Sequence, residues 1–596
     1  MESGTALAPL QEFVYIARLE ARSSQPSHQS YSLPEPSDLS ISYCVESMEI
    51  VLVLCVAAIA VALALLPKLF KRSPFRHIRG PPSPSWLYGH MIMTSREKDV
   101  GDLHFQYMQE YGSAWRMKEC FNKDTLWLVD PKAIQYVLQT SGYHYSRTVV
   151  GRHIARQITG DGILYVEGDD HARVRKIMNP AFSAAQLRSF LPLFRRSARR
   201  LTIKWKDSLR TASAPADHVL NVNSWFTRTT LDVIGEAAYD FRCGALEEED
   251  NEVVDAYKNM FRDSVMYPSG ATLVFRSLWP YIPERLIRLT GYLPTREARR
   301  FRRTLSVVNK ISNRLIKEKT QTCLDRKDEN LRDIMSILVK ANHSENPKTR
   351  MKDKEMISQM ATFFLAGHET TASMLTWMTW ELAKDQDYQE KMRQEIAAVR
   401  AKVSERGDDD FTVADLDSMT FVIAGLKEAL RLHPIVYMMV RSAERDDAIP
   451  LSRPIRDEKG NVISEIPVSK GTSINLSLCG YNRLPEVWGA DAQVWNPYRW
   501  MDTNREKHIN VGVYGNLLTF SGGVKACIGW RFTVIELQAI VVELLENFEV
   551  AIPDDKPDIQ RVPGGLMIPM IRGKPELGSQ MPLKVTAVVR PEKAEV

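Results

Sequence analysis

The residue with the clearest potential for chemistry is Cys527, which lies in a glycine-rich segment of sequence FSGGVKACIG at residues 520–529. Paired glycines permit positive φ and close backbone approach. The cysteine stands just before a predicted helix, whose free amide groups and dipole favour a negatively charged sulfur. Gly529 would let the backbone pass close to a flat ligand. Taken alone, a cysteine in a turn is usually structural, so a space-filling role and a reactive thiolate both stay open.

A second pattern is Glu428-Ala-Leu-Arg431, which places opposite charges three residues apart on one helix face. Such a pair is usually a surface salt bridge that contributes about 0.2–0.5 kcal/mol. This pair, however, lies in an apolar stretch. A buried carboxylate–guanidinium network must be complete, because removal of one member strands a charge at a cost of about 3–5 kcal/mol. The pattern therefore indicates a scaffold rather than catalysis.

Residues 366–371 (AGHETT) place a glycine and four polar residues within a long apolar helix predicted over Met356–Ala383. These residue types oppose both helix propensity and burial, which often marks a functional interruption. A zinc-protease HExxH motif is excluded because Ala372 occupies the second histidine position. A structural kink is the alternative.

His171 and Arg175 are four residues apart in a predicted helix. Residues at this spacing share a helix face, so both side chains can reach the same anion. A solvated helix face is the alternative explanation.

Together these segments resemble the cytochrome P-450 family, over roughly residues 79–590. The loop at 520–529 matches the family's haem signature, Phe-x-x-Gly-x-x-x-Cys-x-Gly, and the other motifs occur in the family's order. The resemblance implies haem b (iron protoporphyrin IX) with the Cys527 thiolate as axial ligand. Lys525 stands where the family most often has arginine. A lysine keeps the charge for a haem propionate but loses the bidentate fork, so we expect weaker anchoring and unchanged chemistry.

The resemblance also implies roles for five other residues. Thr370 would hydrogen-bond the dioxygen, and Glu369 would help to deliver protons. His171 and Arg175 would bind haem propionates. Arg441, ten residues after Arg431, would bind them as well.

Two further assignments follow from the same match. Arg499, in the segment WNPYRW at 495–500, would complete the network of Glu428 and Arg431. Phe520 and Gly529 would belong to the cofactor-binding loop.

The activity implied is that of a monooxygenase, which inserts one oxygen atom of O2 into a hydrophobic organic substrate, in secondary or xenobiotic metabolism. No GxGxxG segment follows a predicted strand, so electrons must come from a partner. For a membrane-anchored member, the resemblance implies an NADPH–cytochrome P-450 reductase, with cytochrome b5 as a further candidate. A haem-thiolate isomerase or dehydratase, and a haem- or ligand-binding protein without turnover, are the alternatives.

The resemblance places four apolar segments around the substrate. They are Val149–Leu164, the helix near Phe363 and Phe364, Val436–Met439, and Leu566–Ile568. We therefore expect a hydrophobic substrate such as a terpenoid, a fatty acid or an aromatic metabolite.

The elements that position these residues read as mostly α with small β-sheets, an α+β fold. The clearest helical patterns are Met356–Ala383, Phe421–Leu432 and Trp530–Phe548. The clearest strand-like segments are Thr125–Val129, Thr472–Leu478 and Leu583–Val589.

Four regions are predicted along the chain. Residues 1–47 are rich in Ser and Pro and are expected to be disordered. Residues 48–67 contain Ile50–Leu66, an uninterrupted apolar run of about the minimum length for a membrane span. Residues 68–90 are basic and proline-rich, and residues 91–596 would form the haem-thiolate domain. The lysine and arginine excess after the span predicts a cytosolic body held by one N-terminal anchor. The family resemblance implies the endoplasmic reticulum as the membrane.

A cleaved signal peptide is the alternative for the apolar run, but nearly fifty residues precede the run, too many for an n-region. Translation from Met48 is a further hypothesis, because it would give an ordinary signal-anchor sequence.

Composition excludes several classes of function. The net charge of +5 over 596 residues gives no argument for a nucleic-acid partner. Two arginine-rich stretches, Arg195–Arg200 and Arg296–Arg303, are predicted to be solvated helix faces. Seven cysteines without a CxxC pair indicate neither a disulfide framework nor a zinc site, and a reducing compartment fits better.

Overall fold

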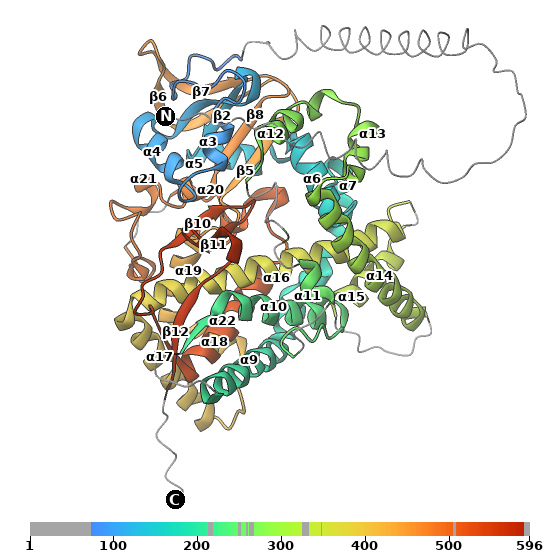
Figure 1. The fold of residues 1–596 in the computed structure, drawn as a ribbon, viewed down its shortest axis with the longest axis vertical. Coiled ribbons are helices and arrows are strands. Elements are labelled where there is room, and N and C mark those ends of the chain that lie inside the picture. Colours follow the sequence, from blue (N-terminus) through green and yellow to red (C-terminus); the bar gives the residue numbers. More distant parts are fainter. Residues whose placement is uncertain are drawn as a thin grey trace, which may run out of the picture. The chain divides into compact units, whose positions relative to one another are not determined.

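A computed structural model describes residues 73–211, 218–247, 252–257, 260, 267–324, 333–346, 348–504 and 508–588 (Figure 1). The predicted tail and membrane anchor, residues 1–67, and the first five residues of the predicted linker lie outside these ranges. Within the ranges described, no helix is long and apolar enough to cross a bilayer.

Helices dominate the described part of the chain, as the sequence predicts. The first ten are α3 (Met91–Ser95), α4 (Asp102–Tyr111), α5 (Pro131–Gln135), α6 (Val149–Thr159), α7 (Gly168–Met178), α8 (Ala184–Arg188), α9 (Leu191–Thr211), α10 (Val222–Tyr239), α11 (Glu252–Tyr257) and α12 (Gly270–Ser277). The others are α13 (Glu284–Ile287), α14 (Arg296–Leu324), α15 (Ile334–Ser344), α16 (Asp353–Lys384), α17 (Gln386–Glu405), α18 (Val413–Ser418), α19 (Thr420–Leu432), α20 (Leu478–Tyr481), α21 (Pro485–Trp488) and α22 (Trp530–Asn547). The three helices predicted most clearly are α16, α19 and α22, and their bounds agree closely with the prediction.

The strands form small sheets. A five-stranded sheet has the order β1 (Ala114–Lys118), β2 (Asp124–Leu128), β8 (Ser473–Ser477), β5 (Met438–Ala443), β3 (Tyr145–Arg147). A three-stranded sheet has the order β4 (Val219–Asn221), β12 (Pro582–Ala587), β9 (Phe548–Ala551). Two hairpins are β6 (Asp447–Arg456) with β7 (Val462–Val468), and β10 (Ile559–Pro563) with β11 (Met567–Ile571). The three predicted strands are β2, β8 and β12, so the α+β class is confirmed.

Helix α16 lies in the middle of the helical part in Figure 1 and packs along α10. Gly367 allows this packing, because a Cβ at that position would lie 2.6 Å from Cδ1 of Ile234. The Thr230 hydroxyl of α10 donates to the carbonyl of His368 at 3.0 Å. Helix α16 continues through the AGHETT segment, so the expected interruption does not break it. Its glycine serves close helix packing.

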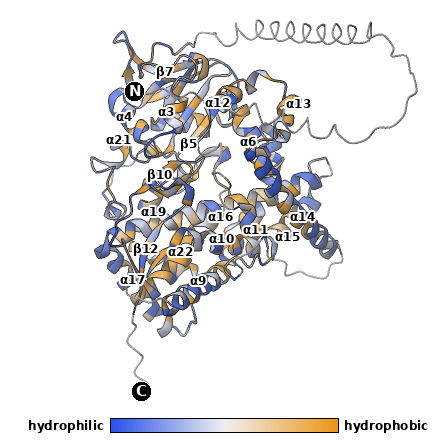
Figure 2. Cartoon of the chain, viewed as in Figure 1, coloured by the Kyte–Doolittle hydropathy of each residue, from blue (hydrophilic) through white to orange (hydrophobic). Residues whose placement is uncertain are grey.

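Helix α22, which follows Cys527, is the most uniformly apolar of the long helices in Figure 2. Nearly all of its residues from Phe532 to Leu545 are buried, whereas α17 and α14 carry many hydrophilic residues. A helix that is buried along most of its length belongs to the core. The core therefore fixes the position at which the cysteine loop ends.

The prediction of a solvated helix face is wrong for Arg195. Its side chain is 1% exposed, and its guanidinium pairs with Asp410 at 3.2 Å and with Glu543 of α22 at 2.8 Å. Helix α9 packs against α22, whose acidic residues lie far away in the sequence, and this packing buries the arginine. The second stretch, Arg296–Arg303, keeps most of its arginines exposed or half-buried in α14.

A buried carboxyl group lies beside the five-stranded sheet. Glu97 is 7% exposed, accepts a hydrogen bond from the Gly101 amide at 2.8 Å and lies 3.7 Å from Nε2 of His104. Burial raises the pKa of Glu97 to about 8; the Asp102 carboxylate raises it further, while the Gly101 amide and the Arg561 guanidinium oppose the shift. Burial lowers the pKa of His104 to about 3, so this imidazole is neutral near pH 7 and supplies no countercharge.

Since Glu97 binds its proton more tightly in the folded state, its contribution to stability is complete at low pH. That contribution is lost as pH rises from about 4.5 to about 8. We expect Glu97→Gln to remove a few kcal/mol of this pH dependence while keeping the hydrogen bond from Gly101. Thermal midpoints of the full chain at about pH 5 and about pH 8.5 measure it. Glu110→Gln, on the exposed side of α4, is the control, and equal pH profiles for the two variants would contradict the prediction.

Candidate functional site

The loop before α22 holds Cys527 in one backbone conformation. The Cys527 amide donates to the carbonyl of Phe520 at 2.9 Å. Gly523 has φ +68°, and a Cβ there would lie 1.8 Å from the carbonyl oxygen of Leu138. A Cβ at Gly522 would also collide with a backbone carbonyl, at 2.0 Å. Both glycines are therefore required by close backbone contacts.

The sulfur itself has an unusual environment. The Cys527 side chain is exposed, yet burial is the main cause that raises the pKa of its thiol. The Gly529 amide and the Arg175 guanidinium lower that pKa, but they do not offset burial. A ligand can therefore reach the sulfur, although surrounding protein atoms keep most bulk water away from it. A cationic partner bound to the sulfur would supply the missing stabilisation of a thiolate.

Gly529 caps α22, and a Cβ built on it would meet only Cε1 of Phe182, at an ordinary 3.8 Å. Protein atoms therefore do not require glycine here. The space beside this residue is open to a ligand, which is what the sequence predicts for a flat cofactor.

Several cationic side chains gather near the loop, from β5, α7 and the loop itself. Arg441 is 5% exposed, and its guanidinium donates to the Val440 carbonyl at 3.2 Å and to the sulfur of Met439 at 3.4 Å. Burial, helped by the neighbouring Arg147, lowers the pKa of Arg441 to about 10. The Arg175 guanidinium donates to the carbonyl of Ala526, next to the cysteine.

His171 belongs to the same cluster but carries little charge. Its Nδ1 lies 3.0 Å from the hydroxyl of Tyr143. Burial lowers the pKa of His171 to about 4, and Arg147 and Lys525 lower it further. His171 can therefore act as a neutral hydrogen-bond partner rather than as a cation near pH 7.

In the described part of the chain, no carboxylate lies within ion-pair distance of Arg175 or Arg441. Arg441 is buried and Arg175 is half-buried. Buried charges are tolerated when they are paired, so these two guanidinium groups suit an anionic ligand. Together with the accessible sulfur of Cys527 and the open space beside Gly529, they fit a flat cofactor with a metal at its centre and carboxylates at its edge.

Sequence reasoning missed two members of this cluster, Arg147 and Glu167. Arg147 pairs with Arg441 in the β3–β5 ladder, and its guanidinium lies 2.9 Å from the Glu167 carboxylate. No local sequence pattern marks Arg147, because its place depends on strand pairing across almost three hundred residues. Glu167 directly precedes the predicted helix of His171 and Arg175. Its closeness in sequence to these two residues is the one feature that could have suggested a place in the site.

The residues predicted for proton delivery lie next to each other in α16. The Thr370 hydroxyl donates to the carbonyl of Ala366 at 2.6 Å, and Oε1 of Glu369 lies 3.4 Å from Nε2 of the buried His368. Both Thr370 and Glu369 are half-buried. Helix α16, which carries both residues, packs against α22, the helix that follows the cysteine loop.

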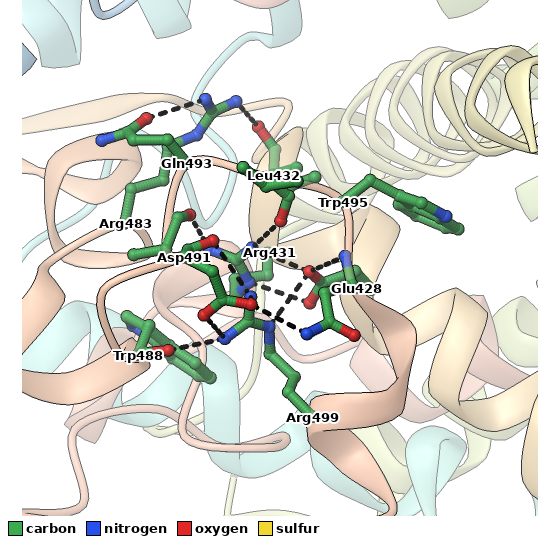
Figure 3. Close-up of polar contacts among 12 residues, drawn as sticks. Glu428, Arg431, Leu432, Arg483, Trp488, Asp491, Gln493, Trp495 and Arg499 are labelled. Atoms are coloured by element: carbon green, nitrogen blue, oxygen red, sulfur yellow. Dashed lines mark hydrogen bonds and ion pairs between the residues drawn. The ribbon is translucent and has the colours of Figure 1, made fainter.

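Figure 3 shows the network around Glu428. Its carboxylate accepts from Nε and NH2 of Arg431 at 2.9 and 2.8 Å, and from Nε of Arg499 at 3.1 Å. The Asn496 amide and the Trp500 indole donate to the same carboxylate at 2.9 and 3.0 Å. Glu428 and Arg431 are fully buried. The structure thus brings the three predicted residues together and fills the acceptor positions of the carboxylate.

The rest of the network satisfies the guanidinium groups. Arg431 donates to the carbonyls of Asn482 and Val494 at 2.9 and 3.1 Å, and Arg499 pairs with Asp491 at 2.8 Å. The sequence did not single out Asp491. The network joins α19 to the segment before the cysteine loop.

Because the Glu428 network is complete and buried, Glu428→Gln should leave the buried Arg431 guanidinium without its carboxylate partner, whereas Arg499 keeps its pair with Asp491. We expect a loss of about 3–5 kcal/mol of unfolding free energy, measured by urea denaturation. Glu390→Gln is the control, because Glu390 pairs with Arg393 at the surface, where a pair contributes about 0.2–1 kcal/mol. Equal losses of unfolding free energy in the two variants would show that burial of the Glu428 network does not increase its contribution to stability, and would contradict the prediction.

The chain matches the family described as Cytochrome P450 over residues 79–576. It is 33% identical to cytochrome P450 monooxygenase 128 of Postia placenta, with 87% of this chain and 94% of that protein covered. It is 31% identical to ganoderic acid synthetase of Ganoderma lucidum, with 80% and 88% covered. It is 29% identical to cytochrome P450 monooxygenase claW of Ampulloclitocybe clavipes, with 83% and 89% covered.

Proposed function

This chain belongs to the cytochrome P450 family, and from that premise we propose that it is a haem-thiolate monooxygenase acting on a hydrophobic organic substrate. The cofactor proposed is haem b, whose iron the Cys527 thiolate would bind. The reaction is RH + O2 + two electrons + two protons giving ROH and H2O. When bound, the haem supplies the activation of dioxygen and the oxidation of the substrate.

The observation that carries the proposal is an accessible cysteine near two guanidinium groups, the half-buried Arg175 and the buried Arg441, that have no carboxylate partner in the described part of the chain. The turn at the paired glycines holds Cys527 at the start of α22, where the Gly529 amide and Arg175 favour a negative sulfur. Arg175 and Arg441 would hold the two propionates, with Lys525 and His171 as further donors. Neither a space-filling cysteine nor a solvated helix face accounts for this combination.

Two residues of α16 would manage protons. The Thr370 hydroxyl donates to the carbonyl of Ala366, which leaves its lone pairs free to accept a hydrogen bond. The half-buried Glu369 can exchange protons with water and is adjacent in sequence. Adjacent side chains of a helix do not face each other, so a proton from Glu369 would reach the Thr370 hydroxyl through water once that hydroxyl turns away from Ala366. Positioned proton transfer is typically worth about 10² to 10⁴ in rate.

The substrate would be hydrophobic. Two segments proposed to line its site are held together, since the Met567 amide donates to the carbonyl of Ile435 at 2.8 Å. A third segment contains Phe363, whose ring lies 5.8 Å from that of Phe182. An apolar site excludes water and favours an apolar ligand. One relative is named for ganoderic acid synthesis, which supports a place in secondary metabolism.

Electrons would come from an NADPH–cytochrome P450 reductase, with cytochrome b5 as a further donor. The basis is the sequence, which carries no GxGxxG segment after a predicted strand. Residues 48–67 would anchor the protein in a membrane with its catalytic part in the cytosol, because basic residues follow this apolar run. The family resemblance suggests the endoplasmic reticulum as that membrane.

Replacement of Thr370 by Ala should uncouple electron transfer from product formation. We expect hydroxylated product per NADPH consumed to fall about tenfold or more, with hydrogen peroxide rising in proportion, because the hydroxyl that passes the proton is gone. Oxygen uptake, peroxide and product are measured in the reconstituted system with reductase.

Thr379→Ala is the matched control, because Thr379 makes the same hydrogen bond to the preceding turn of α16, at 2.9 Å to Leu375. Unchanged coupling in Thr370→Ala would remove the proton relay from the account. Product formed without O2 and NADPH would contradict the monooxygenase activity and would indicate an isomerase or a dehydratase instead.

A further inference from the structure

Glu167 is an acidic residue inside the cationic cluster of the site. Its Oε1 accepts from the guanidinium and the amide of Arg147 at 2.9 and 3.1 Å, and its Oε2 lies 2.5 Å from Nζ of Lys525. Glu167 directly precedes α7, the helix of His171 and Arg175, and its side chain makes no capping hydrogen bond to that helix. One carboxylate thus connects β3, α7 and the cysteine loop.

The charges of this cluster do not balance. Four side chains are cationic: Arg147, Arg175, Arg441 and Lys525. Across the described ranges, Glu167 is the carboxylate that forms ion pairs with members of this set. Glu167 pairs with Arg147 and Lys525. Arg175 and Arg441 stay available for the edge of a cofactor.

Lys525 is largely committed before any cofactor binds. An ammonium group has three donors. One points to Glu167 and another to the carbonyl of Tyr145, at 3.3 Å. The ammonium also lies over the ring of Tyr143, 5.5 Å from its centroid, so at most one donor is left for a propionate. Glu167 therefore decides how much of the Lys525 charge a cofactor receives.

We propose that Glu167 is a positioning residue of the cofactor site, which holds Lys525 and Arg147 in place and offsets part of the cluster's positive charge. This inference rests on the proposed haem-thiolate function. Its consequence is that Glu167 lowers the reduction potential of the bound haem, because a nearby negative charge favours the oxidised iron with its extra positive charge.

The test is Glu167→Gln, which keeps the shape of the side chain and removes its charge. We expect the ratio of reduced to oxidised haem at a fixed potential to rise roughly tenfold, or about 59 mV for a one-electron couple. Spectroelectrochemical titration of the full-length holoprotein measures this ratio. A role in packing alone would lower haem content or thermal stability without moving the potential in this direction.

Asp169→Asn is the matched control, since Asp169 lies two residues further along, in the first turn of α7, and is exposed. A potential shift in Glu167→Gln no larger than in this control overturns the proposal. Glu167→Asp keeps the charge and should keep the wild-type potential. Loss of haem from both Glu167 variants would show a packing role and would also overturn it.

Failure of the proposed function looks different. In that case the wild-type protein itself lacks the red-shifted Soret band of a thiolate-ligated, carbon monoxide-bound haem. If the wild type shows this band but Glu167→Gln leaves the potential unchanged, the function stands and the role of Glu167 does not.

Discussion

The hydrogen bond from the Cys527 amide to the carbonyl of Phe520 closes the turn that presents the sulfur. This turn exists because Gly522 and Gly523 approach backbone carbonyls at distances that a Cβ would forbid. Helix α22 begins directly after the turn and is buried along most of its length. The core thus holds one end of the loop and the glycine contacts hold the other, so the sulfur has little freedom to move.

Charged side chains inside this molecule occur in two arrangements, which differ in whether each charge has an oppositely charged partner. Around Glu428, each carboxylate oxygen has at least two donors, so the network is closed and serves as a scaffold. Near the cysteine, Arg175 and Arg441 have carbonyl or sulfur partners but no carboxylate in the parts of the chain described. A network in which every charge is paired has no charge left to bind a ligand. Guanidinium groups without a carboxylate partner can bind an anion. This difference separates the scaffold from the binding site.

The sequence predicted the elements that depend on local pattern. The apolar periodicity of α16, α19 and α22 and the glycine spacing before Cys527 are local, and the fold class and the family are confirmed. Long-range packing was not predictable: Arg195 is buried because acids of α22 meet it, and Arg147 joins the site because β3 pairs with β5. The role of Gly367 in packing against Ile234 of α10 is a further long-range contact that no local pattern marks.

The central claim is that the sulfur of Cys527 is the axial ligand of a haem. The absorption spectrum of the reduced protein under carbon monoxide tests it most directly, with Cys527→Ser measured beside the wild type. The account predicts the red-shifted Soret band of a thiolate ligand in the wild type and its loss in the variant. A colourless protein after expression with adequate haem, or a band at the position typical of an imidazole ligand, would contradict it.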